Sequence, residues 1–336
     1  MYKILIVGSG GVGVMAAYAL DLSPLAEVTV VVRSDYDIVQ ERGYKIESVD
    51  YGKIEKYTPS HVVKTVSEAA KFGPFDYVVV STKNTPDIFK TEDLVDAVVT
   101  PEKTTIVLLQ NGIHIGEPFI EKYPGNIVLS GVSMISSTNY NADITHTSQD
   151  SLAIGYFNNE NIATQAQKDS AMSFIECYHN GKNHCYYDEN VNFTRWRKLV
   201  YNATLNPICA LTGVDVGRLE IFGGNDTLVR AAMKEVYAVA ASDGVDLPTE
   251  VADIMLASDD GVYYAPSMLV DIIKGNYIEV EVIVGNTVRV AQKNGVEAPM
   301  LSLIYHLLQV VQKKTMELKG RIVLPEQRPD HSFKLE

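Results

Sequence analysis

The feature that most constrains this chain is a glycine-rich turn near its start, Gly8-Ser9-Gly10-Gly11-Val12-Gly13. A strand-like apolar run, Lys3 to Val7, precedes the turn, and a helix-like run, Gly11 to Leu22, follows it. In the pattern G-x-G-x-x-G the first glycine allows a tight turn, the second lets the backbone approach a diphosphate, and the third lets the helix pack close to the strand. The diphosphate then lies at the positive end of the helix, where free N–H groups point at it. In this setting the turn predicts a dinucleotide-binding site rather than a merely tight turn.

The end of the next strand-like run, Glu27 to Val32, bears on the choice of cofactor. An Asp or Glu at that point would bind the ribose 2′-hydroxyl of NAD. Here Arg33 follows the run, and a guanidinium can pair bidentately with a 2′-phosphate. Asp35 is a counter-signal, although it lies two positions beyond Arg33. NADPH is therefore expected, with a solvated surface arginine as the alternative interpretation of Arg33.

Strand-like and helix-like runs alternate through the first half of the chain. The predicted strands are Lys3 to Val7, Glu27 to Val32, Tyr77 to Ser81, Thr104 to Leu109, Ile127 to Val132 and Leu152 to Gly155. The predicted helices are Gly11 to Leu22 and Pro86 to Val99, and Ser136 to Gln149 is interpreted as turn-rich polar sequence. This alternation predicts an α/β fold with a doubly wound, Rossmann-type parallel sheet over residues 1–188.

The second half is mostly helix-like, with a boundary expected near Asp188. The predicted helices are Phe193 to Leu211, Asp226 to Ala241, Thr249 to Ala257, Ser267 to Lys274, Tyr277 to Lys293 and Met300 to Leu318. Gly and Pro residues separate them, as is typical of helix ends. We expect an α-helical C-terminal domain over residues 189–324 and a loose polar tail over residues 325–336.

Composition excludes several classes of function. The chain has 336 residues, 46% of them hydrophobic and 21% charged, which is typical of about two globular domains. The formal net charge of −13 argues against a nucleic-acid binder. Apolar runs are too short to span a membrane, and an apolar strand that begins at once leaves no room for a targeting peptide. Three cysteines fit a reducing compartment, so a cytoplasmic protein is expected.

The segment Trp196 to Pro207 holds the strongest candidate for chemistry. Lys198, Asn202 and Asn206 are spaced i, i+4, i+8, so on one helix they would share an arc of about 80° over about 12 Å. Spacing alone fits an exposed polar stripe. Apolar neighbours leave little of that helix for water, however, and buried polar groups need partners. Contacts with a ligand in an internal cleft would supply them.

Two predicted strands of the first domain end in polar residues. Lys83 follows one of them, and Asn111 follows the other within Gln110-Asn111-Gly112. Ligands of doubly wound sheets lie outside the carboxyl ends of the strands. A solvated loop lysine and an ordinary turn dipeptide are the alternative interpretations.

Taken together, the motifs in this order resemble the ketopantoate reductase family (2-dehydropantoate 2-reductase). The segments that carry the resemblance are Gly8 to Gly13, Arg33, Thr82-Lys83, Gln110-Asn111-Gly112, Trp196 to Leu199 with Asn202 and Asn206-Pro207, and Ser267-Met268-Leu269 with Glu279. The resemblance runs from residue 2 to about residue 310, and the chain is longer than a typical bacterial member.

The resemblance implies an NADPH-dependent reductase that delivers hydride to the carbonyl of a 2-oxo acid. It implies that Lys198 is the general acid and that Glu279 binds or orients the substrate. It further implies substrate contacts from Asn202, Asn206 and Ser267. Cofactor contacts are implied for Lys83 and Asn111, in addition to Gly8, Ser9, Gly10, Gly11, Val12, Gly13 and Arg33. Without the resemblance, Ser267 could be only a helix N-cap and Glu279 a carboxylate in the first turn of a helix.

Other functions remain open from the sequence. A related reductase of another branched or aromatic 2-oxo acid would keep the same lysine and asparagines, and a polyol-phosphate dehydrogenase would need more cationic residues than Lys83 and Lys198. A non-catalytic NADPH sensor would need only the contacts of the first domain. The cluster Cys177, His179, His184 and Cys185 fits no zinc spacing, so no metal is expected. The oligomeric state is left open, a homodimer included.

Overall fold

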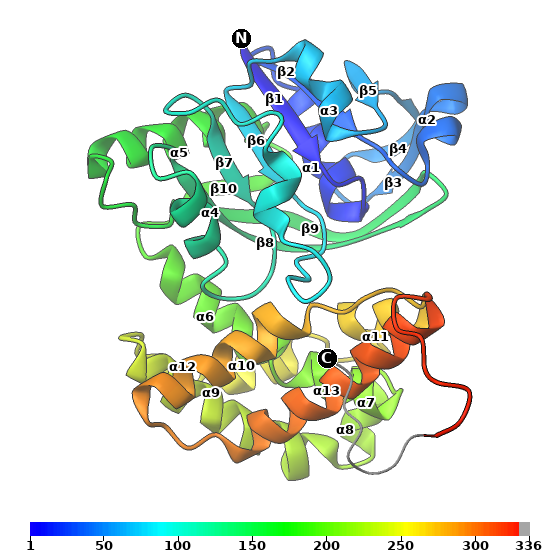
Figure 1. The fold of residues 1–336 in the computed structure, drawn as a ribbon, viewed down its shortest axis with the longest axis vertical. Helices are drawn as coiled ribbons and strands as arrows, with labels where there is room; N and C mark the ends of the chain where they lie inside the picture. Colours follow the sequence, from blue (N-terminus) through cyan, green and yellow to red (C-terminus); the bar gives the residue numbers. More distant parts are fainter. Residues whose placement is uncertain (329–336) are drawn as a thin grey trace. The chain divides into compact units, whose positions relative to one another are not determined.

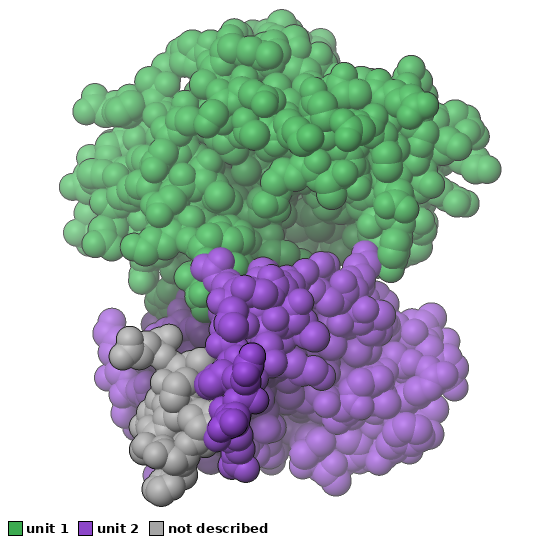
Figure 2. Space-filling view, turned by 45° about the vertical axis from the view of Figure 1, so that its right-hand side comes forward, with its two compact units in different colours: residues 1–196 green, residues 197–336 purple. Residues whose placement is uncertain are grey.

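The chain forms two compact units, Met1–Trp196 and Arg197–Glu336, which Figure 2 colours green and purple. The structure, a computed structural model, describes residues 1–328. The change of unit falls later in the chain than the boundary expected near Asp188. The tail expected over residues 325–336 lies largely outside the described residues.

Among the described residues, unit 1 is built on a ten-stranded sheet with the strand order β4-β3-β9-β8-β7-β6-β1-β2-β5, and β10 pairs with β9 (Figure 1). The strands are β1 (Tyr2–Val7), β2 (Ala26–Val31), β3 (Tyr44–Ser48), β4 (Gly52–Tyr57), β5 (His61–Val63), β6 (Tyr77–Val80), β7 (Thr105–Leu108), β8 (Val128–Tyr140), β9 (Asp143–Tyr156) and β10 (His184–Tyr187). Neighbouring strands from β5 to β8 pair in parallel, whereas β8 with β9 and β3 with β4 are antiparallel. The predicted α/β fold with a Rossmann-type parallel sheet is confirmed, and two antiparallel pairs extend the sheet.

The centre of the sheet explains why the apolar runs form strands. Every residue of β6 and β7 is buried, as are the last four residues of β1. Continuous β-branched runs are typical of strands with both faces covered. The helices and short 3-10 helices of unit 1 are α1 (Gly11–Asp21), α2 (Tyr36–Arg42), α3 (Val66–Ala69), η1 (Ala70–Phe72), η2 (Thr91–Val95), α4 (Glu117–Lys122) and α5 (Thr164–Tyr178). Helix α1 packs against β2, β8, β9 and α5.

Two predictions for unit 1 are wrong. The segment Pro86 to Val99 contains only the short helix η2, because local hydrogen bonds such as that from Thr91 Oγ1 to Asn84 Oδ1 (3.0 Å) compete with a regular helix. The segment Ser136 to Gln149 is not a set of turns but the distal part of the β8–β9 hairpin. Asn141 and Ala142, both with positive φ, form its two-residue turn.

Unit 2 is helix-rich, as predicted, and α6 (Val191–Asn202) leads into it. Its other helices are α7 (Leu205–Thr212), α8 (Val216–Ile221), the π-helix η3 (Asn225–Val229), α9 (Arg230–Ser242), α10 (Val251–Ala257), α11 (Ser267–Ile273), the π-helix η4 (Glu281–Gly285), α12 (Asn286–Asn294) and α13 (Pro299–Leu318). Helix α7 packs against α11 and α13, and α9 packs against α12 and α13. Within residues 1–328, no helix is both long and apolar enough to cross a membrane.

The predicted continuous helix Phe193 to Leu211 is also wrong. Helix α6 ends at Asn202, α7 begins at Leu205, and Thr204 between them has φ −126° and ψ −76°. Pro207 accounts for the break, since a proline ring clashes with the carbonyl four residues earlier, here that of Ala203. Proline is tolerated where it stands, in the first turn of α7.

Candidate functional site

The glycine-rich turn joins β1 to α1, and its three pattern glycines meet different surroundings. Gly8 has φ +119°, and a Cβ on Gly13 would lie 2.0 Å from the carbonyl oxygen of Gly8. Both positions therefore need glycine for the turn to close. A Cβ on Gly10, in contrast, would have no atom within 4 Å, so this side of the turn is open.

The N-terminus of α1 faces the same turn. Gly10 is its N-cap and offers no side chain to the first N–H groups, and the first turn contains no acidic residue. Uncapped N–H groups and the helix dipole favour an anion at this point. The open side at Gly10 and this helix end together fit the diphosphate of a dinucleotide.

At the end of β2, Arg33 and Asp35 differ in their surroundings. Arg33 is exposed, and within residues 1–328 the structure gives it no ion pair or hydrogen bond. Asp35 is buried, 9% exposed, and its Oδ2 accepts a hydrogen bond from Asn139 Nδ2 at 2.9 Å. The same nitrogen donates to the backbone oxygen of Ser9 at 2.7 Å. The carboxylate at this strand end is thus engaged by the protein, whereas the guanidinium is available.

The segments that follow β6 and β7 are tied to each other. Gln110, 4% exposed, donates through Nε2 to the backbone oxygen of Thr82 at 2.7 Å, and its Oε1 lies 3.4 Å from Asn84 Nδ2. Lys83 is exposed and Asn111 is half-buried in these two segments. The structure therefore brings the two predicted cofactor residues to the same, carboxyl-terminal edge of the sheet, on connected segments.

A buried arginine that was not predicted from the sequence, Arg195, bonds to the segment that follows β7. Arg195, on α6, is 5% exposed. Its Nη1 donates to the carbonyl oxygens of Gln110 and Gly112, both at 2.9 Å. Nε and Nη2 donate to Ser130 Oγ at 3.1 and 2.8 Å. Burial lowers the pKa of Arg195 to about 9.

In unit 2, Lys198 and Asn202 lie one turn apart on α6. Lys198 is half-buried. Asn202 is 8% exposed, and within residues 1–328 the structure gives its side-chain amide no hydrogen bond. Asn202 is not among the described residues with a fully buried, unpartnered polar atom, so its amide reaches solvent and can exchange that contact for a ligand.

The prediction that Asn206 shares one helix with these two residues is wrong, because α6 and α7 are separate helices. Asn206, 1% exposed, instead bonds to the start of α11. Its Oδ1 accepts from the backbone N–H of Met268 at 2.8 Å, and its Nδ2 donates to Ser267 Oγ at 3.1 Å. Asn206 thus caps α11 and orients the exposed hydroxyl of Ser267. Ser267 itself is not the N-cap, which is Pro266.

Glu279 is buried, 4% exposed, immediately before the helical stretch that contains η4. Its backbone oxygen accepts from the N–H of Ile283 at 3.3 Å. π-Helical turns are frequent at functional sites. Glu279 is therefore a buried residue at the start of this helical stretch and not a solvent-exposed one.

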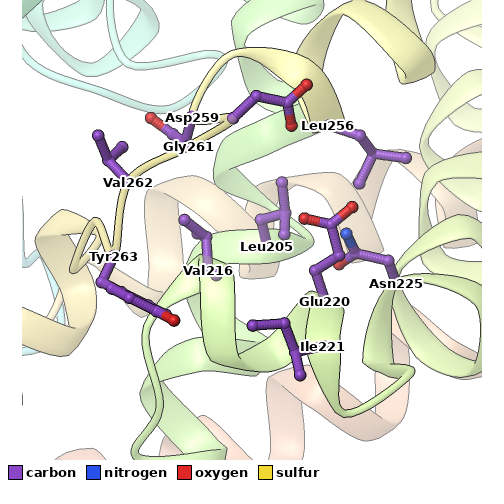
Figure 3. A pocket seen from close by; sticks show the side chains of 12 residues that line it. Leu205, Val216, Glu220, Ile221, Asn225, Leu256, Asp259, Gly261, Val262 and Tyr263 are labelled. Atoms are coloured by element: carbon purple, nitrogen blue, oxygen red, sulfur yellow. The ribbon is translucent and has the colours of Figure 1, made fainter.

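A separate pocket of about 210 Å³ lies within unit 2 (Figure 3). Its polar wall includes Glu220, Asp259, Asp260 and Asn225, and no Lys or Arg lines it. Burial raises the pKa of Asp259, which accepts a hydrogen bond from Tyr201 at 2.7 Å. The five residues predicted for unit 2 are absent from its lining, and its carboxylates would repel a 2-oxo acid. This pocket is therefore not the candidate substrate site.

Of the sequence cluster Cys177, His179, His184 and Cys185, both histidines are exposed and both cysteines are buried in the same core cluster. Cys177 and Cys185 are free thiols in the core of unit 1, and burial raises the pKa of Cys177 to about 11. Among the described residues, no group of three or more His, Cys, Asp or Glu side chains could hold a metal ion.

Comparison with known proteins adds the family. The chain matches the family models "Ketopantoate reductase PanE/ApbA" over residues 4–159 and "Ketopantoate reductase PanE/ApbA C terminal" over residues 190–312. It is 38% identical to an uncharacterized protein of Saccharomyces cerevisiae, over 97% of this chain and 98% of that one.

Solved structures agree with this family. The crystal structure of 2-dehydropantoate 2-reductase from Methylococcus capsulatus is 32% identical, with a TM-score of 0.78, over 93% of this chain and 97% of that one. A ternary structure of D-mandelate dehydrogenase with NADH and anilino(oxo)acetate is 22% identical, with a TM-score of 0.79, over 93% and 99%. The second likeness is one of fold.

Proposed function

Because the chain belongs to the ketopantoate reductase family, we propose that it is an NADPH-dependent reductase of a 2-oxo acid. The substrate proposed first is 2-dehydropantoate, reduced to pantoate for pantothenate and coenzyme A synthesis. The observation that carries the proposal is the side-chain amide of Asn202, which has no hydrogen-bond partner within residues 1–328 and lies one helical turn from Lys198. An amide donor beside an ammonium suits a ligand that has a carbonyl and a carboxylate.

In this proposal each candidate residue of unit 2 has a separate role in the reduction. When bound, NADPH would supply the hydride for the carbonyl carbon. Lys198 stabilises the negative charge that develops on the carbonyl oxygen and gives it a proton from Nζ, which yields the 2-hydroxy acid. Asn202 and the hydroxyl of Ser267 bind the substrate, and Glu279 orients it. Asn206 acts on Ser267, to which it donates at 3.1 Å.

The residues of unit 1 support NADPH rather than NADH. The open side of Gly10 and the uncapped end of α1 suit the diphosphate. Arg33 is exposed and available for a 2′-phosphate, whereas Asp35 is engaged by Asn139. Ser9, Gly11, Val12 and Gly13 complete the turn, and Lys83 and Asn111 are proposed to contact the other half of the cofactor.

A related reductase of an aromatic or branched 2-oxo acid is the second candidate. The fold is shared with a D-mandelate dehydrogenase, and the same lysine and asparagines would serve either substrate. A non-catalytic NADPH sensor would have no use for Asn202, Ser267 and Glu279. A cytoplasmic location remains part of the proposal, in keeping with three free, buried cysteines, as does a homodimer.

The test is a steady-state screen of 2-oxo acids with NADPH, in which oxidation is followed by absorbance. The panel holds 2-dehydropantoate, 3-methyl-2-oxobutanoate and phenylglyoxylate. A kcat/KM for 2-dehydropantoate at least tenfold above the others supports the first candidate. A higher value for phenylglyoxylate or 3-methyl-2-oxobutanoate supports the second, and NADPH binding without turnover of any acid would make the chain a sensor.

A further inference from the structure

Arg195 carries a buried positive charge that no carboxylate neutralises. Its guanidinium forms no ion pair within residues 1–328. The hydrogen bonds that it donates all go to neutral oxygens, namely the carbonyl oxygens of Gln110, Gly112 and Gly131 and the hydroxyl of Ser130. Its Cζ lies over the ring of Phe157, 5.2 Å from the ring centroid. Removing a charge from water without a counter-charge is expensive. A neutral hydrogen-bond donor could hold the segment that contains Gln110 and Gly112 equally well. The positive charge of Arg195 therefore needs a separate explanation.

The position of this charge follows from the strand order. The glycine-rich turn follows β1, Arg33 follows β2, and β6, β7 and β8 lie on the other side of β1. A dinucleotide with its diphosphate at β1 and its adenosine ribose at Arg33 must extend its nicotinamide half over β6 and β7. The segment after β7 contains Gln110 and Gly112, whose carbonyl oxygens accept from Arg195.

The two redox states of the cofactor differ in charge at that end. The oxidised nicotinamide ring carries a positive charge, and the reduced ring is neutral. We propose that Arg195 makes this chain select the reduced cofactor, because its uncompensated buried charge repels the oxidised ring. This inference rests on the proposed function and deepens it, since it names a residue that favours reduction over the reverse reaction.

Coulomb's law gives the expected weakening of NADP⁺ binding by the charge of Arg195. Two like unit charges on the order of 10 Å apart, at an effective dielectric constant of about 20, change a binding constant by roughly tenfold or more. The measured quantity is the ratio of the Kd of NADP⁺ to the Kd of NADPH, determined for both forms by isothermal titration calorimetry. We expect a ratio of roughly ten or more for the native chain.

Two variants separate charge from shape. Arg195→Met removes the charge and should lower the ratio roughly tenfold, whereas Arg195→Lys keeps the charge, loses the forked hydrogen bonds and should hold the ratio within about threefold. Arg42→Met is the matched control: it removes one positive charge from unit 1 at an exposed pair with Asp143 (2.9 Å) and should leave the ratio unchanged.

A third variant keeps the test valid if Arg195→Met does not fold. Circular dichroism shows whether Arg195→Met is folded. Ser130→Asp places a carboxylate beside Nη2 of Arg195, where Ser130 Oγ now lies at 2.8 Å, and should lower the ratio without removing the arginine. A native-like ratio in a folded Arg195→Met or Ser130→Asp chain would overturn the proposal, and so would a ratio near one in the native chain. Failure of the native chain to bind either form would instead overturn the proposed function, and this inference with it.

Discussion

The side-chain amide of Asn139 donates to the carboxylate of Asp35, with Nδ2 2.9 Å from Oδ2. Asn139 comes from the distal part of β8, and the same nitrogen also holds the backbone oxygen of Ser9 at 2.7 Å. The β8–β9 hairpin therefore reaches the glycine-rich turn and bonds to Asp35, an acidic side chain that could otherwise bind a ribose hydroxyl there. This contact bears on the choice between NADPH and NADH.

Replacing Asn139 by alanine should move cofactor preference toward NADH. The change releases Asp35 for a ribose 2′-hydroxyl, and a net hydrogen bond corresponds to roughly a two- to tenfold gain for NADH relative to NADPH. The ratio of kcat/KM for the two cofactors measures it. The double variant Asn139→Ala/Asp35→Asn should lose the gain, and an equal gain in both variants would count against the role of Asp35.

Arg33→Ala should abolish the preference for NADPH. A charge-assisted contact with the 2′-phosphate corresponds to about 1.5–3 kcal/mol, or roughly ten- to hundredfold in kcat/KM. Use of NADH should change little, because NADH has no 2′-phosphate. Lys103→Ala, which removes an exposed positive charge from the same unit, serves as the control. A native chain that used both cofactors equally well would refute the assignment.

Lys198→Ala should lower kcat by about 10²–10⁴-fold, the usual contribution of a positioned general acid. The Kd of NADPH should stay native, because the proposed cofactor contacts belong to unit 1. Lys198→Arg should rescue poorly, since a guanidinium scarcely gives up a proton. Single-turnover hydride transfer beside a fluorescence titration with NADPH distinguishes the steps. A near-native rate in Lys198→Ala would shift the acid role to Lys83.

Asn206→Ala should affect both stability and substrate affinity. It removes the cap on α11, which is worth about 1 kcal/mol and roughly 2–6 °C in Tm. It also releases Ser267, so KM for the 2-oxo acid should rise. Asn206→Asp keeps an acceptor for the N–H of Met268 and should restore much of the Tm. Ser267→Ala should raise KM at native Tm. A rise in Tm for Asn206→Ala would contradict the capping role.

Asp150→Asn should flatten the dependence of stability on pH. Burial raises the pKa of Asp150, which accepts from Tyr178 Oη at 2.8 Å and faces Asp50 and His146. A folded-state pKa raised above the unfolded value gives stability that is complete below about pH 4 and is lost as the pH rises through the folded pKa. The Tm of Asp150→Asn minus the Tm of the native chain should therefore be larger at pH 7 than at pH 4.

Thermal melts by circular dichroism between pH 4 and 8 measure this gain. Asp169→Asn is the matched control, because Asp169 is exposed. The same difference in Tm at pH 4 and at pH 7 would show that the carboxylate of Asp150 does not titrate in this range.

What could be predicted from the sequence is what neighbouring residues determine. The strand, the glycine-rich turn and α1 are contiguous, so their pattern gives the turn correctly down to the open side at Gly10. Lys198 and Asn202 are one turn apart on one helix, as their spacing indicates. Asn206 was misplaced because the effect of Pro207 on the carbonyl of Ala203 outweighs helical periodicity.

The remaining features depend on residues far apart in the chain. Arg195 and Gln110 are 85 residues apart, and Asn139 and Asp35 are 104 residues apart. No local pattern encodes such pairs. For Arg195 the usable signal for burial was its helical spacing, four residues from Val191 and four from Leu199. For the hairpin the usable signal was Ile144 and His146, which alternate with polar residues at the period of a strand.

The position of β3 in the sheet affects how the nascent chain is exposed to aggregation. In the described strand order, β3 lies between β4 and β9, and its Lys45 is in register with Asp143 of β9. During synthesis on the ribosome, β3 and β4 therefore emerge long before the strand that joins them to the rest of the sheet. Until β9 is made, one edge of β3 exposes unpaired N–H and C=O groups, a template for pairing with other chains. Slow translation between these two points would lengthen the interval in which the nascent chain can aggregate or recruit a chaperone.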